Sequence, residues 1–117
     1  MEKPDIQKRT YDFALRIVRL CRAVDEDRVG RVLVNQLLRS GTSIGANVRE
    51  AQGAQSRRDF IAKMHIARKE AMESHYWLCL IRDSELVPAN RLEEIIVEAD
   101  EIVRILSAII LATKANN

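Results

Sequence analysis

The sequence is poor in the residues that mark most non-helical folds. Of 117 residues, four are glycine, two are proline and five are aromatic. So few aromatic residues argue against a β-sandwich or barrel, and against a stacking platform for single-stranded nucleic acid. The content of 47% hydrophobic and 31% charged residues is typical of a folded protein and unlike a disordered or collagen-like chain. We therefore expect an all-α fold, and the length suits a single domain over residues 1–117.

Long hydrophobic runs and cysteine motifs are also missing. The longest nearly apolar run, residues 105–112, is far shorter than the roughly 20 residues of a membrane span, so no membrane partner is expected. The first residues are charged where a signal peptide would be apolar, which predicts a cytoplasmic protein. Cys21 and Cys79 lack the spacing of a zinc or redox motif, and we expect no disulfide.

The sequence does have a clear helical periodicity. Apolar side chains recur every three or four positions in four segments, at about residues 5–24, 27–52, 56–87 and 90–113. The second segment keeps its period through Gly41, which predicts one continuous helix, with a break at Gly41 as the alternative. Short connections between long helices make neighbours antiparallel, so we predict an up-down-up-down four-helix bundle.

Two helix starts are marked by polar residues. Ser56 and Asn90 each precede an acidic residue three positions later, an arrangement that favours the exposed N–H groups of a first turn. Pro88 disfavours a helix at the residue before it, so the third helix is expected to stop before Pro88.

Metal-binding and catalytic motifs are not found. His65 and His75 lack the glutamate three residues earlier that a di-metal bundle uses, and His75 with Cys79 supplies only two ligands. Segment 41–47 lacks the Gly-Lys-Ser/Thr ending of a phosphate-binding loop, and its small residues can instead let another helix approach closely. We expect no cofactor, no metal, no small-molecule substrate and no enzymatic activity.

Several polar residues accompany the apolar face of segment 27–52, Ser40 among them. Buried polar groups need hydrogen-bond partners, so we interpret these residues as a structural polar network rather than a catalytic site. The predicted network consists of Gln36, Arg39, Ser43, Asn47 and Glu50.

Charge is distributed unevenly along a chain whose net charge is only +2. Residues 1–84 hold 16 basic and 11 acidic residues, and residues 85–117 hold 3 and 6. Arginine suits phosphate contact and carboxylate pairing equally, and local ion pairs are the ordinary explanation of any single charge. The first turn after Ser56 also offers N–H groups to an anion. The candidate nucleic-acid-binding residues are Lys8, Arg9, Arg16, Arg19, Arg57, Arg58 and Lys63.

Segment 90–113 is too apolar for a helix with one buried face, which predicts a second contact. A wide core-facing arc within one chain is the alternative to burial between chains. The acidic residues of this segment are expected opposite a neighbour's basic residues. The candidate oligomer interface consists of Glu94, Glu98, Glu101, Ile105 and Leu111.

Residues 36–50 read Gln-Leu-x-Arg-x-x-x-Ser-Ile-x-x-Asn-x-x-Glu, followed by Phe60, the Lys63-Met64 pair and Tyr76-Trp77-Leu78. Over nearly its whole length the chain resembles the bacterial four-helix bundle proteins, also called 23S ribosomal RNA intervening-sequence proteins. It departs from many members at Arg49 and at residues 51–53, where they read Ala-Glu-Gly.

The resemblance implies a homo-oligomeric, pentameric bundle without known enzymatic activity. Related bundles serve as accessory proteins of diversity-generating retroelements and bind nucleic acid through basic surfaces, which makes RNA or DNA an expected partner. We expect a non-enzymatic oligomer that binds structured RNA or other nucleic acid. The alternative is a protein-binding adaptor or assembly scaffold with no nucleic-acid role.

Overall fold

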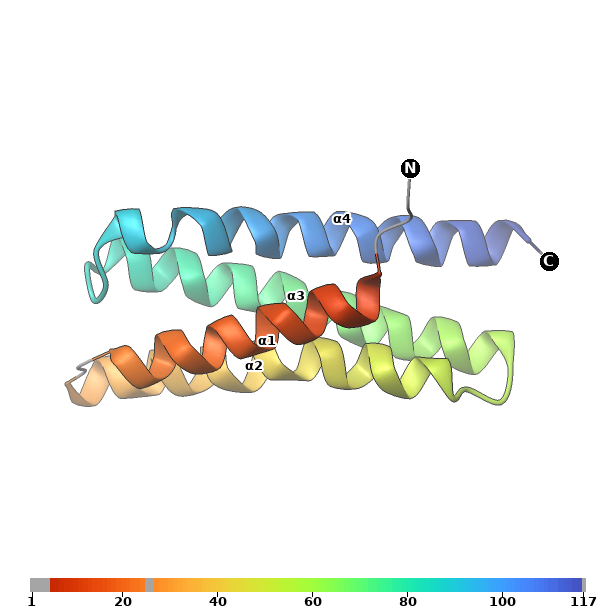
Figure 1. The fold of residues 1–117 in the computed structure, drawn as a ribbon, viewed down its shortest axis with the longest axis horizontal. Helices are drawn as coiled ribbons and strands as arrows, with labels where there is room; N and C mark the ends of the chain where they lie inside the picture. Colours follow the sequence, from red (N-terminus) through yellow and green to blue (C-terminus); the bar gives the residue numbers. More distant parts are fainter. Residues whose placement is uncertain (1–4, 25–26, 117) are drawn as a thin grey trace.

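The computed structural model describes residues 5–24 and 27–116, which form four long helices (Figure 1). They are α1 (Ile6–Ala23), α2 (Arg28–Gln52), α3 (Arg57–Asp83) and α4 (Glu93–Ala115), with a 3₁₀ turn η1 (Ala89–Arg91) before α4. Successive helices run in opposite directions, and no strand occurs in the part of the chain described. The predicted all-α, up-down-up-down four-helix bundle is confirmed.

Side-chain caps fix where three of the helices begin. Asp5, Asp27 and Ser56 each accept a hydrogen bond from the backbone N–H three residues later, at 3.2, 2.8 and 3.0 Å. Each bond satisfies one of the N–H groups that a first helical turn leaves without a partner. The predicted start at Ser56 is therefore confirmed.

The start of α4 differs from the prediction. Asn90 lies in η1, and α4 begins at Glu93 without a side-chain cap. The residue before the helix is Leu92, which is fully buried and whose N–H donates to the carbonyl of Ala89 at 3.0 Å. The predicted cap at Asn90 is wrong because burial of Leu92, rather than a polar side chain, fixes this end of the helix.

Helix α3 stops before Pro88, as predicted, and its last residue is Asp83. Glu85 adopts the left-handed conformation, with φ of 62°. Its N–H donates to the Arg82 carbonyl at 3.1 Å, and the Leu86 N–H reaches back to Ile81 at 3.2 Å. This pair of bonds closes a helix in a Schellman motif, whose left-handed position is usually glycine. A glutamate there gives no sequence signal of the helix end.

Helix α2 continues through Gly41, so the alternative of a break there is wrong. A Cβ at Gly41 would lie 2.9 Å from the Cγ atoms of Ile17, and one at Gly45 would lie 3.3 Å from the Thr10 carbonyl oxygen. Both glycines therefore let α1 approach α2 closely, as the small residues of this segment predicted.

The four helices pack around one elongated apolar core in a molecule of 49 × 28 × 19 Å. The α2–α3 contact is the most extensive, and the α1–α4 contact is the smallest between neighbours. In Figure 1, α1 begins well short of the right end of the bundle, to which the other three helices extend. The large side chains at the centre of the core include Phe13, Ile17, Leu37, Ile44, Met64, Leu78, Ile102 and Leu106.

Candidate nucleic-acid interface

Arg9, in the first turn of α1, binds two carboxylates of its own chain. Its Nε and Nη2 atoms donate to Oε2 and Oε1 of Glu98 at 2.8 and 2.7 Å, and Nη2 also pairs with Glu101. The hydrogen bond to Glu98 is the main cause that raises the pKa of Arg9 above its ordinary value. We call Arg9, Glu98 and Glu101 the Arg9 clamp. Two carboxylates beside this guanidinium compete with a phosphate for it, so among the predicted residues Arg9 is the least available, and its contact with nucleic acid stays a prediction.

The other predicted residues of α1 lie on its solvent face. Lys8 Nζ pairs with Asp12 at 2.6 Å, and this hydrogen bond raises the pKa of Lys8. Arg16 and Arg19 are exposed, and neither forms an ion pair with any residue that the structure describes. Of the four, Arg16 and Arg19 therefore keep their charge most available for a phosphate.

The first turn of α3 carries a second basic group. Arg57 and Arg58 are exposed, and a cavity of about 470 Å³ is lined by these two residues, Ser56 and Ile61. Helix N-termini favour anions because their N–H groups and dipole point outward. The Asp59 carboxylate in the same turn opposes an anion, and Ser56 Oγ already accepts the Asp59 N–H.

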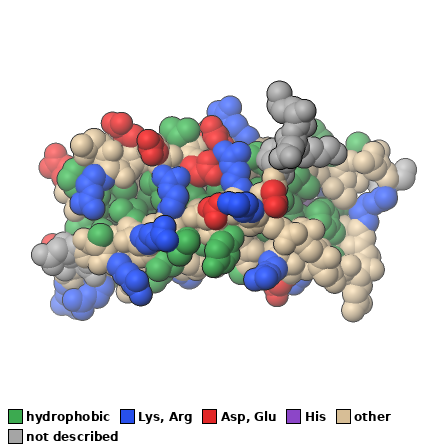
Figure 2. Space-filling view, in the orientation of Figure 1, with side chains coloured by type: hydrophobic (Ala, Val, Ile, Leu, Met, Phe, Trp, Pro, Cys, Tyr) green, Lys and Arg blue, Asp and Glu red, His purple; other side chains and the backbone are tan. Residues whose placement is uncertain are grey.

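The structure separates the predicted residues instead of joining them in one surface. α3 begins at the right end of Figure 1, whereas α1 carries Arg16 and Arg19 toward the opposite end. Lys63 Nζ lies 4.0 Å from Glu50 of α2. In the left half of the face shown in Figure 2, several basic side chains lie near one another with hydrophobic side chains between them, whereas the acidic side chains lie mainly along the upper edge and near the centre.

The groove between α1 and α2 contains residues that the sequence analysis missed. Its volume is about 950 Å³, and Arg49 lies opposite Lys8 along it. The sequence could have predicted that Lys8 and Arg49 line one groove, because α1 pairs antiparallel with α2 around Gly45. The groove is lined by Gln7, Lys8, Tyr11, Ala14, Thr42, Gly45, Ala46, Arg49 and Glu50.

Arg39, the centre of the predicted polar network, links α2 to α3 at the surface. Its Nε donates to Gln36 Oε1 at 3.2 Å, its Nη1 donates to Glu70 Oε2 at 3.0 Å, and Nη2 pairs with Glu73. Trp77 Nε1 also donates to Glu73, at 3.2 Å. The arrangement binds two helices together with no side chain placed for nucleophilic or acid–base chemistry.

The rest of the predicted network is not buried as expected. Ser43 Oγ and Asn47 Nδ2 donate at 2.6 and 2.8 Å to carbonyls one turn earlier in α2, and Glu50 is exposed. The buried polar pair is Ser40 with Ser74, whose Oγ atoms lie 3.0 Å apart between α2 and α3. Ser40 is therefore the polar residue of α2 that is buried against α3, whereas Ser43 and Asn47 are only half-buried.

The residues predicted for an oligomer interface differ in their exposure and in their partners within the chain. Glu98 and Glu101 have Arg9 of the same chain as their partner, whereas a neighbour's basic residues were expected. Glu94 is exposed and forms no ion pair with a described residue. Ile105 is half-buried, and Leu111 is 71% exposed. Only the exposed members keep their side chains available to another molecule.

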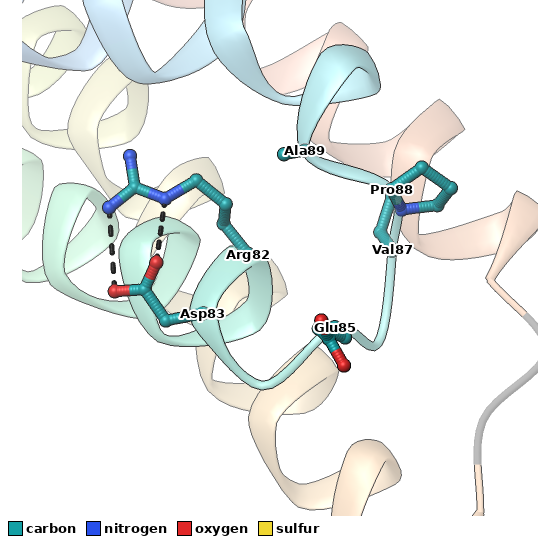
Figure 3. A pocket seen from close by; sticks show the side chains of 6 residues that line it. All are labelled: Arg82, Asp83, Glu85, Val87, Pro88 and Ala89. Carbon is teal, nitrogen blue, oxygen red and sulfur yellow. Dashed lines mark hydrogen bonds and ion pairs between the residues drawn. The ribbon is translucent and has the colours of Figure 1, made fainter.

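A further cavity, of about 460 Å³, lies where α3 connects to α4 (Figure 3). Arg82 bends back onto Asp83, donating from Nε at 2.8 Å and from Nη2 at 3.4 Å. These hydrogen bonds raise the pKa of Arg82 and lower that of Asp83. Because the pair neutralises its own charge, this cavity is a poor site for a phosphate.

The two histidines and two cysteines lie outside any metal-binding arrangement in the described residues. Cys79 Sγ is 3.8 Å from His75 Nδ1, and neither cysteine forms a disulfide with a residue that the structure describes. None of the four helices described is long and apolar enough to cross a membrane.

Comparisons with known proteins agree with the geometry. The model of a family described as 23S rRNA-intervening sequence protein matches residues 2–108. A crystal structure from Bacteroides thetaiotaomicron, described as a protein of unknown function from the S23 ribosomal protein family, is 45% identical in sequence. The alignment covers 90% of this chain and 97% of that chain, with a TM-score of 0.84. The search of curated proteins finds no match.

Proposed function

Because the chain belongs to the 23S rRNA-intervening sequence protein family, we propose that it is a non-enzymatic cytoplasmic homo-oligomer that binds RNA or other nucleic acid through basic helix surfaces. The resemblance implies a pentamer. The observation that carries the proposal is the first turn of α3, where two exposed arginines and outward-pointing N–H groups surround one cavity. Arg16 and Arg19 supply a second, separate point of contact.

Assembly matters to this function because one copy carries a net charge of only +2. Nonspecific affinity for nucleic acid rises with the number of phosphates that the protein neutralises. Several copies would present their α3 turns together, and linked weak contacts bind far more tightly than one alone. The two basic groups of each copy are thus sufficient only within an oligomer.

The proposal is tested by reversing the charge of the α3 turn. Arg57→Glu with Arg58→Glu should weaken binding to fragments of 23S rRNA of every sequence alike. It should also reduce the slope of log affinity against log salt by about 2, one unit for each lost phosphate contact. Binding is measured by titration of the purified oligomer at several salt concentrations.

The matched control is Lys69→Glu with Arg91→Glu, which changes the net charge equally at two exposed positions away from the α3 turn. This variant should keep the salt slope of the parent. Binding that is independent of salt and of both double variants would contradict the proposal.

A protein-binding adaptor is the second candidate, and one observation favours it. Ile66, Met72 and Tyr76 are 44–58% exposed along the outer side of α3. Exposed apolar side chains on one helix face are typical of a protein interaction site. An oligomer that binds no nucleic acid would leave the adaptor as the better proposal.

A further inference from the structure

The groove between α1 and α2 has a low floor and charged rims. Ala14, Gly45 and Ala46 present almost no side chain there, while Lys8 and Arg49 stand on opposite sides. The phenol of Tyr11 is 63% exposed beside this floor. Small residues between two helices let the backbone of a third helix approach closely, and the two cations favour an acidic partner.

The outer face of α4 has the matching chemistry. Its exposed positions Glu94, Val97, Glu101, Arg104, Ala108 and Leu111 follow each other at alternating intervals of three and four, so they share one helix face. Val97 is 56% exposed next to Glu94, which forms no ion pair within the described part of the chain. An apolar side chain beside an unpaired carboxylate complements an apolar floor between two cations.

From this complementarity we infer that the α1–α2 groove of one copy receives the amino-terminal half of α4 of a second copy. Val97 lies over Tyr11 and the small residues of the floor, and Glu94 pairs with Lys8 or Arg49. The inference rests on the proposed homo-oligomer and names the surface into which α4 docks. Because groove and helix are different surfaces, each copy offers one of each, and the contact is head-to-tail.

Nucleic acid fits this groove less well than a helix does. Glu50 lines the groove beside Arg49, and Asp12 holds the Lys8 ammonium at 2.6 Å. These carboxylates would lie close to a phosphate backbone, and like charges at short range repel. The amino-terminal half of α4 carries Arg104 as well as Glu94 and Glu101 on this face, so it brings less net negative charge near Glu50 and Asp12 than a phosphate backbone does.

Two variants remove one surface each. Ala46→Trp fills the groove floor, and Val97→Arg places a cation opposite Lys8 and Arg49; both positions are exposed, so the bundle itself should stay folded. Each variant should raise the dissociation constant of the assembly at least tenfold. At micromolar concentration, light scattering should then give the mass of a single chain, 13.4 kDa. Circular dichroism checks that helicity is unchanged, and Ala46→Glu replaces Ala46→Trp if the tryptophan variant unfolds.

Mixing the two monomeric variants is the decisive measurement. The Ala46→Trp chain keeps an intact α4 and the Val97→Arg chain keeps an intact groove, so the mixture should form one-to-one dimers and nothing larger. Matched controls are Ala62→Trp on the exposed side of α3 and Val32→Arg on α2, where Val32 is 58% exposed. Both controls should assemble as the parent does.

The outcomes separate this inference from the proposed function. A parent chain that is itself monomeric overturns the proposed assembly and the docking contact together. A parent that assembles while both variants also assemble overturns only the docking contact. Monomeric variants that remain monomeric on mixing overturn the head-to-tail pairing. Nucleic-acid binding by a monomeric parent would leave the α3 turn as the functional surface and place the groove outside any contact between copies.

Discussion

The contact between α2 and α3 and the contact between α1 and α4, which we call seams, have the same arrangement of ion pairs. They differ greatly in how extensively the two helices pack. In each, one arginine bridges two glutamates of the other helix, Arg39 to Glu70 and Glu73 and Arg9 to Glu98 and Glu101. The α2–α3 pairing lies at the edge of the most extensive contact in the bundle, whereas the α1–α4 pairing lies on the smallest.

This difference in packing between the two seams indicates where an ion pair contributes most to stability. Exposed ion pairs on a packed interface contribute about 0–1 kcal/mol, because water screens them and the core already fixes the geometry. Arg9 is less exposed than Arg39, with 31% against 48% of the side chain accessible, and the Arg9 clamp has less packing to support it. The clamp should therefore control whether α1 stays on α4.

The largest expected effect is a packing defect in the α2–α3 seam. Ser74→Leu places a large side chain against Ser40 between α2 and α3, where Ser40 and Ser74 are fully buried. Overpacking of this kind should lower the free energy of unfolding by about 3 kcal/mol. Urea denaturation followed by circular dichroism measures it.

Ser74→Ala is the matched control for that seam. It removes the hydroxyl without adding volume, and Ser40 Oγ keeps its hydrogen bond to the Leu37 carbonyl at 3.3 Å. The expected loss is about 1 kcal/mol. Equal losses for the leucine and alanine variants would mean that the seam is loosely packed.

A smaller and more local effect is expected at the α1–α4 seam. Arg9→Ala leaves two neighbouring carboxylates without their cation, which should cost about 1–2 kcal/mol. Hydrogen exchange should speed up for the amides of α1 before it does for those of α2 and α3, because α1 would open locally. Arg16→Ala, on the same helix without an ion pair to a described residue, should change stability by no more than about 0.5 kcal/mol.

Arg39→Ala completes the comparison between the seams. Its expected cost is about 1 kcal/mol or less, with no selective opening of α2 or α3, since the core between them is unchanged. If Arg39→Ala opened its seam as readily as Arg9→Ala opened the other, the amount of packing would not explain the difference.

The helices themselves could be predicted because their apolar positions repeat with the helical period. The pattern extends through Gly41 unchanged, and the structure has one helix there. The last residue of α3 could not be predicted, because Glu85 occupies a left-handed position that the sequence marks only when it is glycine. The start of α4 was misplaced for a similar reason, since buried Leu92 replaces the polar cap expected at Asn90.

The candidate site was harder to predict because its charges interact across the fold. Arg9 and Glu98 are 89 residues apart in the sequence, and no local pattern shows that they form hydrogen bonds. The cations of the groove, Lys8 and Arg49, likewise meet only after α1 has packed on α2. Periodicity indicates which face of a helix is buried, but not which residue lies opposite it.

The smallest expected effect concerns Gln36 and Asn47, at the margin of the α2–α3 seam. Buried partners there would make each alanine variant cost about 1–3 kcal/mol. In the structure, Asn47 donates to a carbonyl of its own helix, and Gln36 accepts from an arginine that has two carboxylate partners besides. Neither Gln36→Ala nor Asn47→Ala leaves a buried group unsatisfied, so each should change the free energy of unfolding by no more than about 0.5 kcal/mol.

Thermal denaturation of the two variants beside Ser74→Ala tests this, because only the serine lies in the buried part of the seam. A loss at Asn47 as large as that at Ser74 would show that the well-packed region extends to the edge of α2, and that the two seams differ less than their contacts indicate.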